Sequence, residues 1–75
     1  HKATVVALRD FHRRHPGAEL GDLVVDPNPA VRAVGWRACR RLPEVTRWAV
    51  EQAVAENDPA ASLAATETGI VFGLP

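Results

Sequence analysis

The chain of 75 residues contains no methionine and no tyrosine, and only 5% of its residues are aromatic. A core without aromatic bulk must be aliphatic and rich in alanine, which favours closely packed helices over a β-sandwich. The single cysteine, Cys39, excludes an intramolecular disulfide and favours a reducing compartment, so we expect a cytoplasmic protein. No apolar run approaches the roughly 20 residues of a membrane span, and nothing at the start resembles a secretory signal. Because the chain starts at His1 and lacks Met, we expect it to be a fragment of a longer protein.

Charge is balanced overall but unevenly distributed along the chain. Nine basic and five acidic residues give residues 1–47 a net charge of +4. Four acidic residues with no basic residue give residues 48–75 a net charge of −4. This asymmetry allows an anionic partner near the first part of the chain. It equally allows one part of a longer array to dock on another.

Apolar residues at helical spacing predict five helices. They cover residues 3–14, 18–25, 29–42, 43–56 and 58–72, although "DLVVD" within the second is also compatible with a strand. Pro16 and Gly17 end the first helix, and Asn28-Pro29 supplies a cap followed by a proline at the first helical position.

The same turn chemistry recurs, because Asn28-Pro29-Ala30 matches Asp58-Pro59-Ala60 at a spacing of 30 residues. A period of 20–50 residues made of paired helices is typical of a helical solenoid. Two matches are few, so a chance similarity stays open on this evidence alone.

The stretch "DPNPAVRAVGWRACRRLPEV", residues 26–45, resembles the HEAT and HEAT-like (armadillo-type) helical repeats, with Asp-Pro-x-Pro-x-Val-Arg as their hallmark. The match is good over residues 26–45 and loose over residues 57–73. The resemblance implies an all-α, right-handed α-solenoid segment of stacked antiparallel helix pairs. Residues 1–75 then form one segment: 1–25 end one repeat, 26–56 make a full repeat, and 57–75 begin the next.

The resemblance also implies a structural polar ladder, in which Asp26 and Arg32 make polar contacts within and between repeats. The second copy departs from the motif, because Glu56 and Ser62 stand at the places of Asp26 and Arg32. We therefore expect Arg32 to reach Glu56 as well as Asp26. The helical wheel agrees: Arg32 lies at the edge of an apolar arc, where a charge is costly unless it is paired.

The opposite arc of the same helix carries Arg37, Arg40 and Arg41, which we take with Trp36 as a candidate partner-binding surface. The alternative for the arginines is a solvated face near a helix C-terminus, where the dipole favours cations. Trp36 and Trp48 are candidate hot spots. They are equally candidates for packing the third helix onto the fourth, which we favour, above all for Trp48.

Residues that could carry chemistry have structural explanations. His12 and His15 have a metal-ligand spacing, but Arg13 and Arg14 between them would repel a cation. Cys39 lies on the apolar arc with no histidine close in sequence to activate it. We therefore expect no catalytic, cofactor-binding or metal-binding residue in this segment. Whether the protein is an enzyme stays open, and the sequence leans against it.

Apolar residues on the fourth and fifth helices imply that flanking repeats or another protein cover Leu63, Ile70 and Val71. The resulting hypothesis is a non-catalytic protein-interaction or scaffolding module of a HEAT-like repeat protein. The alternative is a nucleic-acid-binding domain related to the HEAT-like DNA glycosylases, which uses the basic residues of the first 47 positions. A third hypothesis, a subunit of an enzyme such as a bilin lyase, would need catalytic residues outside this segment.

Overall fold

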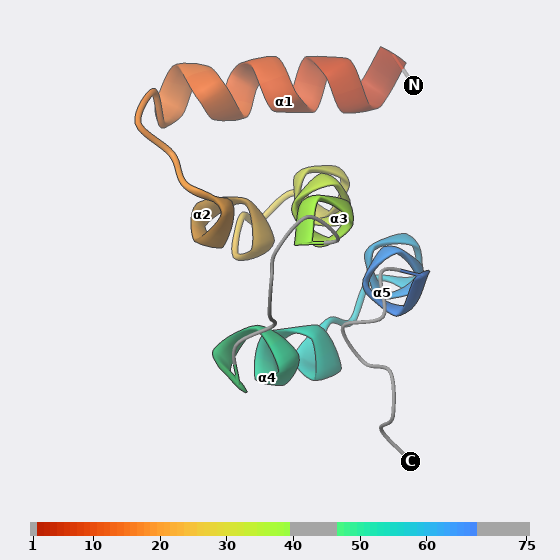
Figure 1. Ribbon diagram of the computed structural model, residues 1–75. Coiled ribbons are helices and arrows are strands. Elements are labelled where there is room, and N and C mark those ends of the chain that lie inside the picture. The colour runs from red at the N-terminus through yellow and green to blue at the C-terminus, as the bar shows by residue number, and fades with distance from the viewer. Residues whose placement is uncertain (1, 40–46, 68–75) are drawn as a thin grey trace.

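The computed structural model describes residues 2–39 and 47–67, and this part of the chain is helical with no strand. Figure 1 shows its elements: α1 (Lys2–Arg14), α2 (Leu20–Val24), α3 (Pro29–Ala38), α4 (Arg47–Ala55) and α5 (Pro59–Glu67). The predicted all-α class is confirmed, and "DLVVD" contributes to α2 rather than to a strand. The predicted extension of the third helix to residue 42, the start of the fourth at residue 43 and the end of the fifth at residue 72 lie outside the described residues.

Each of the two proline-marked turns starts a helix by the same chemistry. The Asn28 side-chain oxygen accepts a hydrogen bond from the Ala30 amide at 2.9 Å, and Pro29 is the first residue of α3. Asp58 likewise accepts from the Ala61 amide at 3.0 Å, and Pro59 is the first residue of α5. These caps satisfy amides that a helix start leaves unpaired, so the local sequence sets where both helices begin.

The second helix starts two residues later than predicted because of its own cap. The Asp22 carboxylate accepts a hydrogen bond from the Glu19 amide at 2.8 Å, which places the helix start at Leu20. The predicted boundary at residue 18 is therefore two residues early, a normal uncertainty for a helix end.

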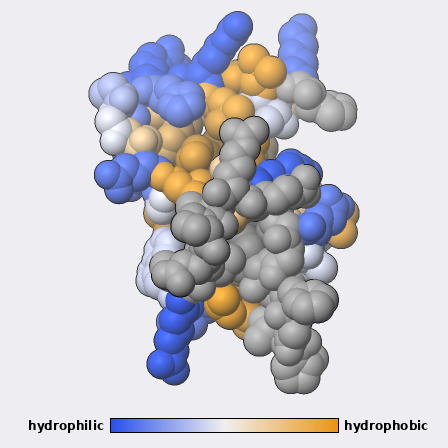
Figure 2. Space-filling model, viewed as in Figure 1, coloured by the Kyte–Doolittle hydropathy of each residue, from blue (hydrophilic) through white to orange (hydrophobic). Residues whose placement is uncertain are grey.

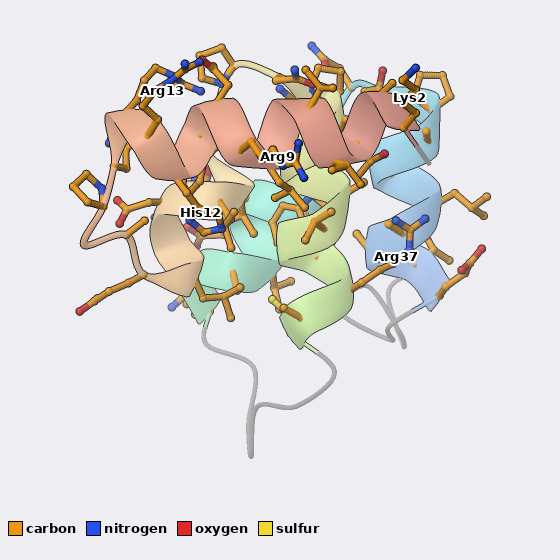
Figure 3. All side chains as sticks on the ribbon, turned by 90° about the horizontal axis from the view of Figure 1, so that it is seen from above. Lys2, Arg9, His12, Arg13 and Arg37 are labelled. Carbon is orange, nitrogen blue, oxygen red and sulfur yellow. The ribbon has the colours of Figure 1, made fainter. Side chains whose placement is uncertain are left out.

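Helix α3 occupies the centre of the arrangement and contacts α1, α2 and α5. It lies beside α5, and the two helices run in the same direction (Figures 1 and 3). Helix α1 lies across the top of α2 and α3, and α4 lies at the opposite end of the molecule, against α5 (Figure 1). The outer faces of α1 and of α4 and α5 are therefore the two ends of the described structure.

The core consists of small side chains around one large one. Between α3 and α5 the buried residues are mostly alanines, so these two helices approach closely around Trp36, which is only 1% exposed. A second cluster holds α1 onto α3, through the buried Ala7, Phe11 and Val31. The core is aliphatic and alanine-rich, as the composition predicts.

Gly35 is the point of closest approach between α2 and α3. A methyl group at this position would lie 2.9 Å from the Leu23 Cβ and 2.9 Å from the Val24 Cγ1, with the Val24 amide nitrogen at 3.1 Å. Separations this short cannot be relieved by moving a flexible side-chain end, because they involve a Cβ atom and backbone. Glycine at position 35 is therefore a packing requirement of α3.

We predict that Gly35→Ala destabilises the chain by about 1–3 kcal/mol, because overpacking outweighs the roughly 1 kcal/mol that alanine gains in a helix. The matched control is Gly21→Ala in α2, where a methyl group would lie 4.0 Å from the Trp48 ring. This control should be neutral or stabilising. Urea unfolding of the two variants measures the difference, and equal midpoints would contradict the close packing of α2 on α3.

Candidate functional site

The most elaborate side-chain arrangement in the described residues joins the start of α3 to the start of α5. Arg32 donates two hydrogen bonds to Glu56, from Nε to Oε1 at 2.8 Å and from Nη2 to Oε2 at 3.0 Å. Its Nη1 donates to the backbone carbonyls of Asp26 and Pro27, both at 2.9 Å. We call Arg32, Glu56 and the groups that they bind the polar joint. The bidentate geometry is the strongest form of an arginine–carboxylate pair.

Glu56 accepts further hydrogen bonds from both sides of the polar joint. The Trp36 indole Nε1 donates to Oε1 at 3.1 Å, and the Asp58 amide donates to Oε2 at 3.1 Å. The side chains of Arg32 and Glu56 are 17% and 3% exposed. Burial by itself raises the pKa of Glu56, but the hydrogen bonds from Arg32, Trp36 and the Asp58 amide outweigh it and lower this pKa to about 2. Glu56 is therefore held as a carboxylate at neutral pH.

Asp26 contributes to the joint differently from the expected ladder. Only its backbone carbonyl contacts Arg32, whereas its buried carboxylate accepts from the Asn28 amide at 2.9 Å and from Arg14 Nη2 at 3.3 Å. The side chain folds back onto its own turn because an aspartate readily bonds the amide two residues later. Arg14, which the sequence analysis did not assign to this site, thereby ties the end of α1 to the turn before α3.

The two tryptophans differ in burial. Trp36 is buried in the core with its indole nitrogen bonded to Glu56, so it packs, as the favoured interpretation has it, and does not belong to an exposed partner-binding surface. Trp48, for which packing is the favoured prediction, is 46% exposed. The reason lies in α5: the start of that helix brings Glu56 over α3, which draws Trp36 inward.

A hollow of about 310 Å³ opens beside the polar joint, but its polar groups are already used. Its lining includes Asp26, Arg32, Glu56 and Gln52. The first three bond to one another, to Arg14 and Trp36, or to nearby backbone. Among the described residues no buried polar side-chain atom lacks a partner. Its described acidic and basic groups are therefore paired within the structure, as in a structural joint.

An apolar pocket lies between α2, α3 and α4. Its lining includes Leu20, Val24, Cys39 and Trp48. Burial raises the pKa of the Cys39 thiol, which keeps the sulfur protonated and poorly nucleophilic at neutral pH. Cys39 acts here as a small buried apolar side chain, as its place on the apolar arc predicts.

The arginine surface is only partly described. Arg37 is exposed and projects from α3 on the side of α5 (Figure 3), while Arg40 and Arg41 lie outside the described residues. The described cations gather mainly on α1, where Lys2, Arg9 and Arg13 are exposed. Figure 2 shows hydrophilic side chains along the upper edge of the molecule, over this helix.

The histidine pair forms ring contacts rather than a metal site in the described structure. His12 lies edge-on to Phe11 with ring centroids 5.4 Å apart, and His15 lies 5.1 Å from the same ring. Residues 2–39 and 47–67 contain no group of three residues placed to hold a metal ion.

The end of the molecule opposite α1 exposes apolar surface. Leu63 is 56% exposed on α5, and Val54 on α4 is also exposed. Ile70 and Val71, which we expected to share this surface with Leu63, lie outside the described residues. Leu63 alone therefore represents the surface that the sequence assigns to a flanking repeat or partner.

No family model, curated protein or solved structure matches the chain. Within the part of the chain that the structure describes, none of the helices has the length and apolar character needed to cross a membrane. The function must therefore be argued from the polar joint and the exposed faces themselves.

We predict that Glu56→Gln destabilises the chain by about 3 kcal/mol, because it leaves the Arg32 guanidinium buried without its counter-charge. The matched control is Glu51→Gln, which breaks the exposed pair of Arg47 and Glu51, 3.4 Å apart on α4. The control should change stability by less than about 0.5 kcal/mol. Urea unfolding measures both changes, and similar effects of the two substitutions would refute the role of the polar joint.

We also predict that acid weakens the fold through Glu56. Its folded-state pKa of about 2 lies below the ordinary glutamate pKa of 4.5, so its stabilisation is complete above pH 4.5. That stabilisation, roughly 3 kcal/mol, should be lost as the pH falls towards 2. The difference in free energy of unfolding between the parent chain and Glu56→Gln, measured across this range, isolates the contribution. A difference that does not shrink between pH 5 and about pH 2 would contradict the prediction.

Proposed function

We propose that the chain is a protein-interaction or scaffolding segment of a right-handed HEAT-like α-solenoid, without catalysis of its own. The single observation that carries the proposal is the polar joint. In it, Arg32 near the start of α3 donates two hydrogen bonds to Glu56, which lies just before α5. The joint fixes one proline-started helix beside the next, which is how a repeat array propagates.

The direction of the two helices supports this proposal. Helices α3 and α5 begin with matching capped prolines 30 residues apart, lie side by side and run the same way (Figures 1 and 3). The equivalent helices of successive repeats have this relation in a solenoid. The proposal also includes antiparallel pairing of α3 with α4. The connection between these two helices, residues 40–46, lies outside the described residues.

The exposed faces support a binding role. A solenoid segment uses its outer faces to contact neighbouring repeats and partner proteins, and an exposed large apolar side chain such as Leu63 marks such a face. The polar groups at the centre of the molecule, by contrast, are bonded to one another. We therefore propose that flanking repeats of the same chain or a protein partner cover Leu63, Ile70 and Val71, and that the protein is cytoplasmic.

We predict that an idealised HEAT-like helix pair, fused after Pro75, raises the thermal unfolding midpoint by docking on α5. Adding a neighbour adds an interface energy to a repeat array, and about 1 kcal/mol shifts the midpoint of a small domain by roughly 4–8 °C. Leu63→Asp should remove most of this gain because it places a carboxylate in the new interface.

The control is Val6→Asp, the same kind of change at a valine that is 59% exposed on α1, at the other end of the molecule. It should leave the gain from the fused pair intact. Without the fusion, both substitutions should shift the free energy of unfolding by less than about 0.5 kcal/mol. A fused pair that adds no stability, or a gain that survives Leu63→Asp, would contradict the proposed array.

A further inference from the structure

The outward face of α1 carries a row of three cations, of which only Arg13 has an acidic partner in the described structure. Lys2, Arg9 and Arg13 are spaced seven and four residues apart, so they fall within about 40° of one another around the helix. Along the axis they extend over about 16 Å. Val5 and Val6, both exposed, flank this row on its two sides. We call these five residues the cationic ridge.

The ridge keeps most of its charge free. The structure describes no acidic partner for Lys2 or Arg9, and Arg13 pairs only with Asp10, at 3.0 Å on the open surface. Exposed ion pairs of this kind contribute little to stability, so a carboxylate of a partner can replace Asp10 beside Arg13 at a small cost in free energy. Figure 3 shows Lys2, Arg9 and Arg13 along the outer surface of α1, well separated from Arg37 on α3.

The helix that presents the ridge is fixed from behind. Ala7 and Phe11 bury the opposite face of α1 in the cluster with Val31 of α3. At its end, Arg14 reaches the buried carboxylate of Asp26. A partner therefore meets a preformed surface, which lowers the entropic cost of binding.

We propose that the cationic ridge binds an acidic amphipathic helix of a partner protein, an inference that rests on the proposed interaction function and names the chemistry of one partner. The three cations require carboxylates on the partner helix. These carboxylates lie seven and four residues apart along that helix, so that they face Lys2, Arg9 and Arg13. Apolar residues on either side of those carboxylates pack on Val5 and Val6. This is helix-to-helix recognition, with anchors repeating at helical spacing.

The composition of the ridge favours such a helix over a nucleic-acid backbone. Two exposed valines, 45% and 59% exposed, flank the cations, and Asp10 lies beside Arg13. Protein–DNA interfaces are more polar and far more positively charged than this surface. A phosphate chain would cover the two valines without making apolar contact with them, whereas apolar side chains of a helix can pack on them.

The test uses a labelled synthetic helix of about 18 residues, with Glu at the matching spacing, Leu beside each Glu, and Ala and Gln elsewhere. Fluorescence anisotropy should show binding to the 75-residue chain that weakens as salt rises. Arg9→Glu should weaken it at least about tenfold, because one attraction becomes a repulsion. A scrambled peptide of the same composition should bind at least about tenfold more weakly.

Arg47→Glu is the matched control, since Arg47 is 92% exposed on α4, far from α1 (Figure 1), and the change in net charge is identical. It should leave peptide binding unchanged. The proposal is overturned by no binding at low salt, by equal losses in the two variants, or by a duplex DNA that binds more tightly than the peptide and depends on Arg9. Leu63 and the face of α5 on which the fused pair docks do not belong to the ridge, so failure of peptide binding leaves the array proposal standing.

Discussion

The ion pair between Arg32 and Glu56 determines how the chain is arranged in space. Arg32 lies at the edge of an apolar arc, and burying its guanidinium without a counter-charge would cost more free energy than a small domain can spare. Glu56 supplies the counter-charge and accepts hydrogen bonds from Arg32 at 2.8 and 3.0 Å. It lies 24 positions further along the chain, shortly before α5. Satisfying one charge therefore fixes the start of α5 beside α3.

Other features of the core follow from this constraint. Once α5 is held against α3, the contact between them must be filled by residues small enough for close approach, and Ala61, Ala64 and Ala65 fill it. The ring of Trp36 is enclosed with its indole nitrogen directed at Glu56. A polar atom on the largest core side chain thus obtains a partner from the same carboxylate that neutralises Arg32. One buried acid satisfies four N–H donors: two from Arg32, one from Trp36 and one from the Asp58 amide.

The sequence predicts those features that depend on neighbouring residues or on the repeat. Asn28 with Pro29 and Asp58 with Pro59 mark helix starts by local chemistry, and the structure confirms both starts. The contact of Arg32 with Glu56 follows from the 30-residue spacing. The contact of Arg14 with Asp26 follows from no pattern, because it depends on how α1 crosses the turn. The burial of Trp36 and exposure of Trp48 depend on the placement of α5, which a helical wheel does not contain.

In this molecule the polar groups that stabilise the fold are different from those that are free to bind a partner. Carboxylates that would be suited to catalysis, Glu56 and Asp26, are buried and already accept hydrogen bonds from arginines and amides. Acid–base catalysis needs a group that can reach a substrate and exchange a proton near neutral pH, and a pKa of about 2 removes Glu56 from that range. Groups with unused binding capacity lie instead on the outer faces, as cations on α1 and apolar side chains on α4 and α5. Such a distribution suits a segment that holds its own helices rigidly and meets other proteins at both ends.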